Sequence, residues 1–533
     1  MADHPGEVAV TINDERLSEE AAPLVGQLVA DRAASRLTSQ DHTLWGEAAE
    51  AEAAIRLSWT TLHETSRPLL AEIDALRAEL RAEGIDRVVL AGMGGSSLAP
   101  EVITATAGVP LIVLDTTDPG QVADALAGDL DRTVVVVSSK SGSTVETDSH
   151  RRIFAAAFEA EGIDAGSRIV VVTDPGSPLE DLAAGYRRVF QADPNVGGRY
   201  SALTAFGLVP SGLAGADVAA LLDEAAATAK TLSQDSADNP AVLLAAALSA
   251  AHARGAEKVV LADTGSGITG FGDWAEQLVA ESTGKEGTGL LPVVVEGPEA
   301  PGFADAGEDA TAVAIGPGGA VSTSGSLGGM FLLWEYATAL AGRLLGINPF
   351  DQPDVEAAKK AARALLDNPT EQAGSGQSFL DGPIEVHGAP DGVTTLVEAL
   401  QVLTGSAPEF GYIAVQAYLD RIADASAAVL RPELARKTGL QTTFGWGPRF
   451  LHSTGQYHKG GHQNGVFLQI TGYPETDIDV PDRPYSLGVL QLAQAVGDGQ
   501  VLSGLDRPVL RLHLTDRAAG LAHLVHTLAE VSR

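Results

Sequence analysis

The sequence predicts an α/β protein in which parallel sheets are covered by helices on both faces. Short, fully apolar runs occur at residues 88–90, 111–114, 134–137 and 169–172. Each run is followed by Gly, Ser, Thr or Asp and then by a segment whose apolar residues have helical spacing. Continuous apolar strands that alternate with helices are typical of parallel sheets buried on both faces. In such sheets ligands sit beyond the carboxyl ends of the strands.

The pattern divides the chain into four parts. Residues 1–84 have helical apolar spacing and few β-branched runs, so we expect a helical N-terminal segment there. We expect a first α/β domain over residues 85–235 and a second over residues 236–368. Residues 368–378 have the composition of a linker, and an additional C-terminal α/β region follows over residues 379–533.

The later parts repeat the alternation of strands and helices. In the second domain we expect strands at 258–262, 291–295 and 312–315, and helices at 327–345 and 355–366. In the C-terminal region we expect strands at 412–418, 442–445, 466–470 and 509–514, and helices at 423–437, 487–496 and 518–531. The first two domains share this style but not a repeated sequence.

The composition excludes several classes of protein. The 533 residues carry a net charge of −35, which should repel nucleic acid and anionic membranes. The absence of cysteine excludes disulfides, thiolate zinc sites and cysteine nucleophiles. The polar N-terminus does not look like a signal peptide, and the longest uncharged stretch, about 311–334, begins with many Gly, Ser and Pro residues. We therefore expect a cytoplasmic protein.

Residues 134–147 are the most informative segment. Four valines predict a buried strand, and a polar turn separates them from a helical pattern. The turn contains Ser139, Lys140, Ser141, Ser143 and Thr144. Such a turn combines O–H donors, free backbone N–H groups and the positive end of a helix dipole, which suits a phosphate monoester. Lys140 adds a point charge. The alternative is an ordinary N-cap, but four hydroxyls and a lysine favour the phosphate.

Two further segments could complete such a site. Residues 91–97 follow the first strand, and their glycines let a backbone approach a ligand closely, while Ser96 adds a donor. The third glycine of a dinucleotide-binding fingerprint is missing. Gly197 and Gly198 place Arg199 on a tight turn before a helix. That arginine could hold an oxyanion or could pair with a structural carboxylate.

Taken together, five motifs in order resemble those of the glucose-6-phosphate isomerase family, which has two sugar-isomerase (SIS) domains. The motifs are residues 94–96, 139–147, 196–201, 280–285 and 346–359. The resemblance covers roughly residues 85–365. It is strongest to the isomerase half of bacterial transaldolase/glucose-6-phosphate isomerase fusions, whose C-terminal part has a run similar to residues 447–455.

The resemblance implies roles for the matched residues. The implied phosphate-binding residues are Ser96, Ser139, Lys140, Ser141 and Thr144, and Gly95 and Gly198 are further substrate-binding positions. Glu281 matches the base that moves a proton between C2 and C1 of the opened sugar. Arg199 matches the cation that stabilises the cis-enediolate, and Lys359 matches a lysine near the ring oxygen.

The chemistry agrees with these roles. A 1,2-proton shift needs one base and positive charge where the enediolate forms, so we expect no cofactor and no metal. Trp274, Leu278 and Val279 could shield Glu281 from water. The alternative for Glu281 is a solvated carboxylate at a helix end.

One family feature is missing. The family has a histidine, usually from the neighbouring subunit, that helps to open the sugar ring, but this chain has no histidine between Arg254 and Val386. His452, His458 and His462 follow in the C-terminal region. We expect His452 to be the replacement because it ends a predicted strand. The spacing of the three histidines could also suit a metal, but no carboxylate partner stands out.

The resemblance thus predicts an enzyme that interconverts glucose 6-phosphate and fructose 6-phosphate, and a homodimer. Two alternatives stay open: an isomerase that also accepts mannose 6-phosphate, and a non-catalytic sugar-phosphate sensor.

Overall fold

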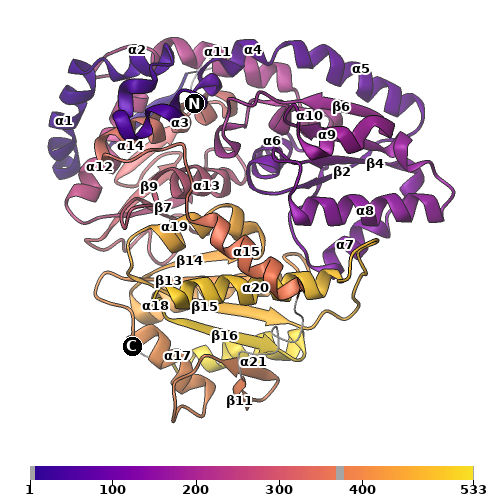
Figure 1. Cartoon of the computed structure of the whole chain (residues 1–533). Coiled ribbons are helices and arrows are strands. Elements are labelled where there is room, and N and C mark those ends of the chain that lie inside the picture. The colour runs from indigo at the N-terminus through magenta and orange to yellow at the C-terminus, as the bar shows by residue number, and fades with distance from the viewer. Residues whose placement is uncertain (1–6, 368–376, 532–533) are drawn as a thin grey trace.

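The computed structural model describes residues 7–367 and 377–531, and it confirms the predicted α/β fold class. Three sheets form in three parts of the chain, and helices flank each of them (Figure 1). The first two sheets occupy the upper half of the view, and the third lies below them in orange and yellow. Within the described residues, no helix is long and apolar enough to cross a membrane.

The first sheet has five parallel strands in the order β3-β2-β4-β5-β6. The strands are β2 (Arg87–Gly92), β3 (Ile112–Leu114), β4 (Thr133–Ser138), β5 (Ile169–Thr173) and β6 (Arg188–Gln191). The helices are α6 (Leu98–Ala107), α7 (Pro119–Leu126), α8 (Val145–Ala160), α9 (Pro178–Leu182), α10 (Ala205–Ala214) and α11 (Val218–Leu232). Successive valines of β4 enter two different apolar clusters, one on each face of the sheet. That two-sided burial explains the uninterrupted apolar run.

The second sheet has the order β1-β10-β9-β7-β8. Its strands are β1 (Ala9–Ile12), β7 (Lys258–Asp263), β8 (Leu291–Val294), β9 (Ala310–Ile315) and β10 (Val321–Ser324). The helices are α12 (Pro240–Ala253), α13 (Phe271–Thr283), α14 (Leu327–Leu345) and α15 (Val355–Asp367). All its strands run parallel except β1, which pairs antiparallel with β10.

The N-terminal segment is not helical throughout. Its helices are α1 (Glu15–Ala30), α2 (Ala33–Thr38), α3 (Glu47–Ala53), α4 (Leu62–Thr65) and α5 (Pro68–Ala82). The preceding strand β1, which the sequence analysis did not predict, is the edge strand of the second sheet. Four residues are too few to show a clear period of two, and the partner strand lies more than 300 residues away.

The third sheet has the order β11-β12-β16-β15-β13-β14. Its strands are β11 (Gln377–Asp381), β12 (Ile384–His387), β13 (Tyr412–Tyr418), β14 (Gln441–Trp446), β15 (Gly465–Gly472) and β16 (Val509–Leu514). The helices are α17 (Leu396–Gly405), α18 (Leu430–Thr438), α19 (Gly455–Gly460), α20 (Leu487–Gly504) and α21 (Arg517–Leu528). The four predicted strands are present, and the hairpin of β11 and β12 adds two more. Helix α15 of the second domain packs along α20, which joins this region to the rest.

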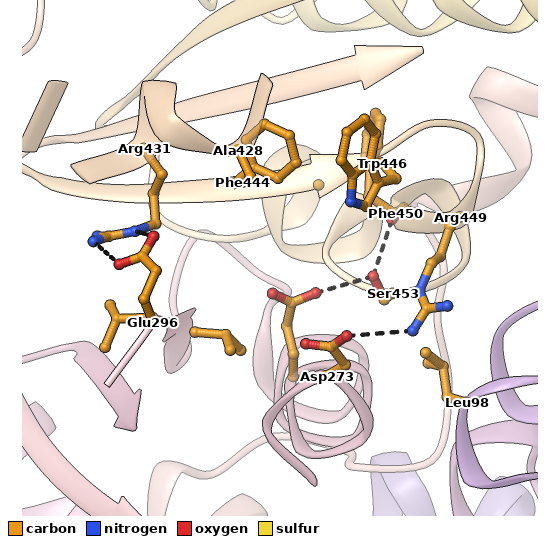
Figure 2. Close-up of a pocket in the computed structure, with 14 residues that line it drawn as sticks. Leu98, Asp273, Glu296, Ala428, Arg431, Phe444, Trp446, Arg449, Phe450 and Ser453 are labelled. Carbon is orange, nitrogen blue, oxygen red and sulfur yellow. Dashed lines mark hydrogen bonds and ion pairs between the residues drawn. The ribbon is translucent and has the colours of Figure 1, made fainter. Parts of the chain in front are cut away.

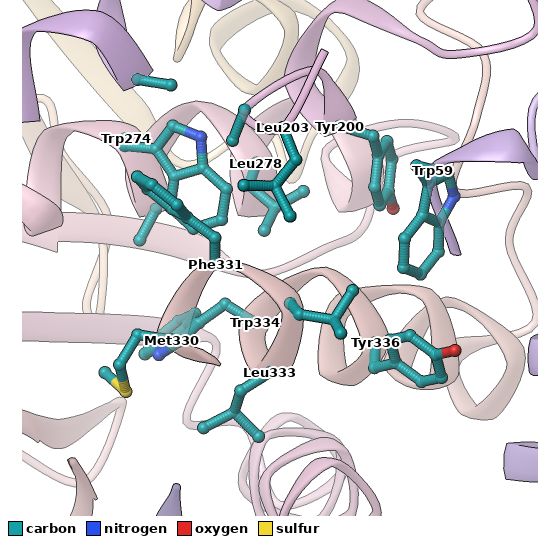
Figure 3. Close-up of a cluster of buried hydrophobic side chains, with 14 of the residues drawn as sticks. Trp59, Tyr200, Leu203, Trp274, Leu278, Met330, Phe331, Leu333, Trp334 and Tyr336 are labelled. Atoms are coloured by element: carbon teal, nitrogen blue, oxygen red, sulfur yellow. The ribbon is translucent and has the colours of Figure 1, made fainter. Parts of the chain in front are cut away.

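The largest apolar core surrounds α14 (Figure 3). Phe331 of α14 meets Trp274 of α13 with ring centroids 4.6 Å apart. Trp59, from the N-terminal segment, stacks on Tyr200 at 5.0 Å. Rigid aromatic packing of this kind fixes α13 and the turn around Tyr200, and both elements carry residues of the predicted site.

Candidate active site

All the predicted site residues line one pocket of about 450 Å³. They are Gly95, Ser96, Ser139, Lys140, Ser141, Thr144, Gly198, Arg199, Glu281, Lys359 and His452. The pocket receives residues from both sugar-isomerase-like domains and from the C-terminal region. It begins at the carboxyl ends of β2 and β4, where Gly92 and Ser138 are paired across the two strands.

The hydroxyl-rich turn is not an ordinary N-cap. Thr144 is the N-cap residue of α8, yet its side chain caps no backbone N–H. Its Oγ1 lies 2.9 Å from Ser139 Oγ, and Ser141 Oγ lies 3.1 Å from Ser143 Oγ. Ser139 Oγ and Ser141 Oγ also accept from the backbone N–H groups of Gly142 and Ser143 inside the turn. The uncapped first N–H groups of α8 and the hydroxyl donors are what the turn offers to an anion.

Lys140 lies at the side of this turn. Its ammonium group pairs with the carboxylate of Asp174, another pocket residue. Burial raises the pKa of Asp174, and Lys140 opposes that shift. The lysine side chain is 27% exposed. It can therefore turn toward a phosphate that enters the pocket.

The glycines before Ser96 allow close contacts within the chain. A Cβ on Gly95 would lie 1.9 Å from the carbonyl oxygen of Gly198, so Gly95 allows the turn that carries Arg199 to approach. Gly94 has a φ of +54°, and a Cβ there would lie 2.8 Å from the carbonyl oxygen of His452. Both glycines also line the pocket, and the close approach of a ligand to them stays a prediction.

Arg199 is 2% exposed and is held by five hydrogen bonds. Its Nε donates to Ser282 Oγ at 2.8 Å, and its Nη1 donates to Gln352 Oε1 at 2.8 Å and to Glu281 Oε2 at 3.4 Å. Its Nη2 donates to the carbonyl oxygens of Pro349 and Asp351. The guanidinium is thus oriented before any ligand binds, and one of its partners is the carboxylate of Glu281 inside the pocket.

Glu281 is buried near the end of α13, which excludes the solvated helix-end carboxylate. Trp274, Leu278 and Val279 are buried on the same helix, as expected. Burial raises the pKa of Glu281, and the nearby Arg199 partly opposes the shift. A carboxylate with a raised pKa accepts a proton more readily than an exposed one.

Residues 346–353 position Arg199 and Lys285 near Glu281. Lys285 donates to the carbonyl oxygen of Asn348 at 2.7 Å and to that of Asp351 at 2.6 Å. Burial lowers the pKa of Lys285 to about 8, with Arg199 adding to that shift. The backbone carbonyls of this segment therefore serve both Lys285 and Arg199.

Lys359 lies on α15, at the mouth of the pocket. Its ammonium group pairs with Glu356 at 2.8 Å, and its side chain is 45% exposed. It is the most exposed of the three predicted cations, and a single surface ion pair holds its long side chain weakly.

His452 reaches the pocket from the C-terminal region, but it does not end a strand. Strand β14 ends at Trp446, and His452 lies at the end of the 3-10 helix η9 (Arg449–His452). The expectation that His452 ends a strand was therefore wrong, although His452 does line the pocket.

His452 is oriented by a carboxylate that the sequence analysis did not single out. Its Nε2 lies 3.1 Å from Oε1 of Glu146, and Gln494 donates to the same oxygen at 2.7 Å. Burial alone would raise the pKa of Glu146, but His452 reverses the effect and the pKa falls to about 2. Glu146 lies within the motif at residues 139–147, so the sequence offered a reason to consider it as a site residue. No motif contained Gln494.

The other two histidines lie elsewhere. His458 is buried against Tyr412, Phe450 and Phe467, and burial holds its pKa well below the usual value. His462 pairs with Glu257 at 3.0 Å. Among the described residues, no group of three or more His, Asp or Glu side chains is arranged to hold a metal ion.

Gln277 is a further pocket residue that the sequence analysis missed. It lies one helical turn before Glu281 on α13, and its amide donates to the carbonyl oxygen of His452 at 2.8 Å. The spacing of four residues from the predicted base could have identified it. It connects α13 to the segment that carries His452.

The chain is similar to known proteins of one family. The model of the phosphoglucose isomerase family matches residues 69–301. The matched range contains Ser96, Arg199 and Glu281, whereas Lys359 and His452 lie beyond it.

Individual relatives agree with the family model. A glucose-6-phosphate isomerase of Rubrobacter xylanophilus is 30% identical over 374 residues, which cover 54% of this chain and 84% of that protein. One from Citrifermentans bemidjiense is 30% identical over 381 residues, covering 57% of this chain and 72% of that protein. The crystal structure of a glucose-6-phosphate isomerase from Chlamydia trachomatis superimposes with a TM-score of 0.54 at 18% identity, over 69% of this chain and 90% of that chain. It shows a shared fold.

Proposed function

The chain belongs to the phosphoglucose isomerase family, and we propose that it interconverts glucose 6-phosphate and fructose 6-phosphate through a cis-enediolate, with Glu281 as the base. The observation that carries this assignment is the pair of Glu281 and Arg199 in the same pocket as the hydroxyl-rich turn. One end of the pocket suits a phosphate, and the other suits a proton transfer next to a developing negative charge.

In the proposed reaction the substrate phosphate binds at the turn. Ser96, Ser139, Ser141 and Thr144 supply hydroxyl donors, and Lys140 moves from Asp174 to the phosphate. The N-terminus of α8 adds backbone N–H groups. The phosphate takes no part in the chemistry and fixes the position of the carbon chain.

Glu281 then takes the proton from C2 of the open-chain aldose and returns it to C1, while the hydroxyl proton of O2 passes to O1 within the cis-enediolate. The enediolate carries negative charge on its oxygens during this step, and the fixed guanidinium of Arg199 lies next to Glu281 to stabilise it. The same groups catalyse the reverse reaction, because Glu281 is protonated in the intermediate and can return the proton to either carbon.

Ring opening requires an acid at the ring oxygen. We assign this step to His452, oriented by Glu146, together with Lys359 at the pocket mouth. In this assignment the C-terminal region supplies the function that the missing family histidine would have had. The site is then built from residues of a single chain.

The test is a coupled assay of glucose 6-phosphate formation from fructose 6-phosphate with the wild type and Glu281→Gln. We expect kcat to fall by roughly 10²- to 10⁴-fold in the variant, as is usual when a general base is removed. An equal melting temperature would show that the amide variant is folded. Full activity of the variant would refute the role of Glu281, and inactivity of both proteins would favour the sensor.

The two alternatives are not favoured. The matched family and the relatives described above are glucose-6-phosphate isomerases by name. A sensor has no need to bring Glu281, Arg199 and Lys359 together in the pocket. Measuring kcat/KM with mannose 6-phosphate would quantify any activity on the second sugar.

Three properties of this protein stay predictions: a particular likeness to transaldolase fusions, assembly as a homodimer, and a cytoplasmic location. Light scattering during size-exclusion chromatography tests the dimer. Since all the proposed catalytic residues come from one chain, a dilute monomer should keep its activity.

A further inference from the structure

A second pocket, of about 240 Å³, lies between the second domain and the C-terminal region (Figure 2). Strands β8 and β14 are edge strands of their sheets, and both end at this pocket. Carboxyl ends of parallel strands are a common place for ligands. None of its lining residues lines the active-site pocket.

The two sides of this pocket differ in chemistry. Phe444 and Trp446 at the end of β14 form an aromatic side, with ring centroids 4.9 Å apart and planes at 80°. Asp273 and Glu276, one turn apart on α13, form an acidic side, and Figure 2 shows Asp273 across the pocket from Phe444 and Trp446. An aromatic face next to carboxylates is the usual environment of an organic cation.

The charged groups around the pocket do not balance. Three arginines accompany five carboxylates: Arg421, Arg431 and Arg449 against Glu101, Asp115, Asp273, Glu276 and Glu296. Arg449 alone pairs with three of the carboxylates, and Arg431 pairs with Glu296. Within the described chain, Glu276 has no ion-pair partner and accepts only a 3.3 Å hydrogen bond from Ser453.

We propose that this pocket binds a small organic cation, an alkylammonium or alkylguanidinium compound. Its charged head lies at Glu276 and Asp273, and its carbon chain lies against Phe444 and Trp446. The arginines of the pocket are already paired with carboxylates, so an anion would have to break existing ion pairs. A cation instead supplies the charge that the carboxylates lack.

The ionisation of Glu276 agrees with this ligand class. Burial raises the pKa of Glu276 to about 8, with a further contribution from Asp273, while Arg449 and the hydroxyl of Ser453 lower it. The ionised form is therefore a minority at neutral pH, and a bound cation would stabilise it. Glu296 and Arg431, on the β8 side of the pocket and on α18, pair with each other.

Since the cation binds the ionised form of Glu276, its affinity should increase as the pH rises through the pKa of Glu276.

The test is isothermal titration calorimetry of the full chain with butane-1,4-diamine and with butylguanidinium. Butane-1,4-diol is the neutral control. We expect saturable binding of both cations and none of the diol. Glu276→Gln should weaken binding by roughly tenfold or more, the scale of one lost charged contact. Glu299→Gln changes the same charge at an exposed position outside the pocket and should leave binding unchanged.

Two further measurements locate the ligand and the proton. Trp446→Leu should also weaken binding, because it removes the aromatic face. Wild-type affinity should increase between about pH 7 and about pH 9, and Glu276→Gln should lose that dependence. Absence of saturable binding by both cations, equal binding to Glu276→Gln, or equal binding of the diol would overturn the proposal. Calorimetry needs no turnover, so the result is independent of the isomerase assignment.

Discussion

The two ends of the active-site pocket are built in different ways. At the phosphate end, hydroxyls of the turn at residues 139–144 bond to each other and to backbone N–H groups of the same turn, and Lys140 is 27% exposed. At the reactive end, Arg199 is 2% exposed and has five hydrogen bonds to fixed partners. The first end can adjust to its ligand, and the second is oriented in advance. Catalysis depends on preorganised charge at the reacting atoms, whereas an anchor needs only affinity.

The largest difference between the two ends should appear when the cation at each end is removed. Arg199→Met should lower kcat by roughly 10²- to 10³-fold, the usual effect of losing one stabilising donor at a developing oxyanion. Lys140→Met should mainly raise KM, because it weakens the binding of the phosphate in ground state and transition state alike. Steady-state kinetics of both variants with fructose 6-phosphate give the two values.

Because Arg199 also holds the segment at residues 346–353, Arg199→Lys is the folding control. It keeps a charge and loses the planar fork, and should recover only part of kcat. If both methionine variants changed KM alone, the distinction between the two ends would be wrong.

The next effect concerns ring opening. His452→Ala should lower kcat/KM by roughly 10²-fold with ring-closed glucose 6-phosphate and by less with an open-chain analogue. Glu146→Gln should act in the same direction more weakly, because it leaves the imidazole in place and changes its orientation. Rapid-mixing kinetics with both substrate forms separate the two steps. Equal losses with both forms would argue against a role in ring opening.

A smaller effect is expected at the phosphate turn. Thr144→Val or Ser139→Ala should each raise KM by roughly tenfold, since each removes one hydrogen bond to a charged group. The value of kcat should stay within about threefold of the wild type. Ser167→Ala is a matched control, because Ser167 lies outside the pocket. A large fall in kcat would show that the turn takes part in the chemistry.

The smallest expected effect is a shift in the pH profile of kcat/KM, which the wild type alone can show. Burial raises the pKa of Glu281, so the base becomes protonated at a higher pH than an exposed glutamate would. The acid limb of kcat/KM should therefore lie above the ordinary glutamate value. Arg199 lowers this pKa, so Arg199→Met should move the limb to still higher pH and Lys140→Met should not. A pH profile of the three proteins checks the sign.

Much of this site could be predicted from local sequence. The valines of β4 predict a buried strand, and the neighbouring order of β2 and β4 brings their polar turns together. The signals of the strands and turns are local, or follow from the rule that carboxyl ends of parallel strands share one edge. The roles of Glu281 and Arg199 came instead from the resemblance of their motifs to those of the glucose-6-phosphate isomerase family.

The remaining features depend on long-range contacts. His452 and Glu146 are 306 residues apart, and Gln494 is 348 residues from Glu146. A single sequence has no local pattern that records such a pairing. The same reason explains β1, whose partner β10 is about 300 residues away. Gly94 and Gly95 were recognised as glycines that permit a close approach, but the sequence could not show that the segments of Gly198 and His452 come close to them.

The ion pairs between the C-terminal region and the first sheet have a consequence for motion. Asp115 and Asp118 are 1% and 0% exposed, and their guanidinium partners are Arg449 and Arg517. Moving the region away would separate both carboxylates from their guanidinium counter-ions, at a cost of several kcal/mol for each buried pair. The C-terminal region should therefore stay fixed against the first sheet and should not open to admit substrate. In the proposed mechanism, His452 would then stay in place through every turnover.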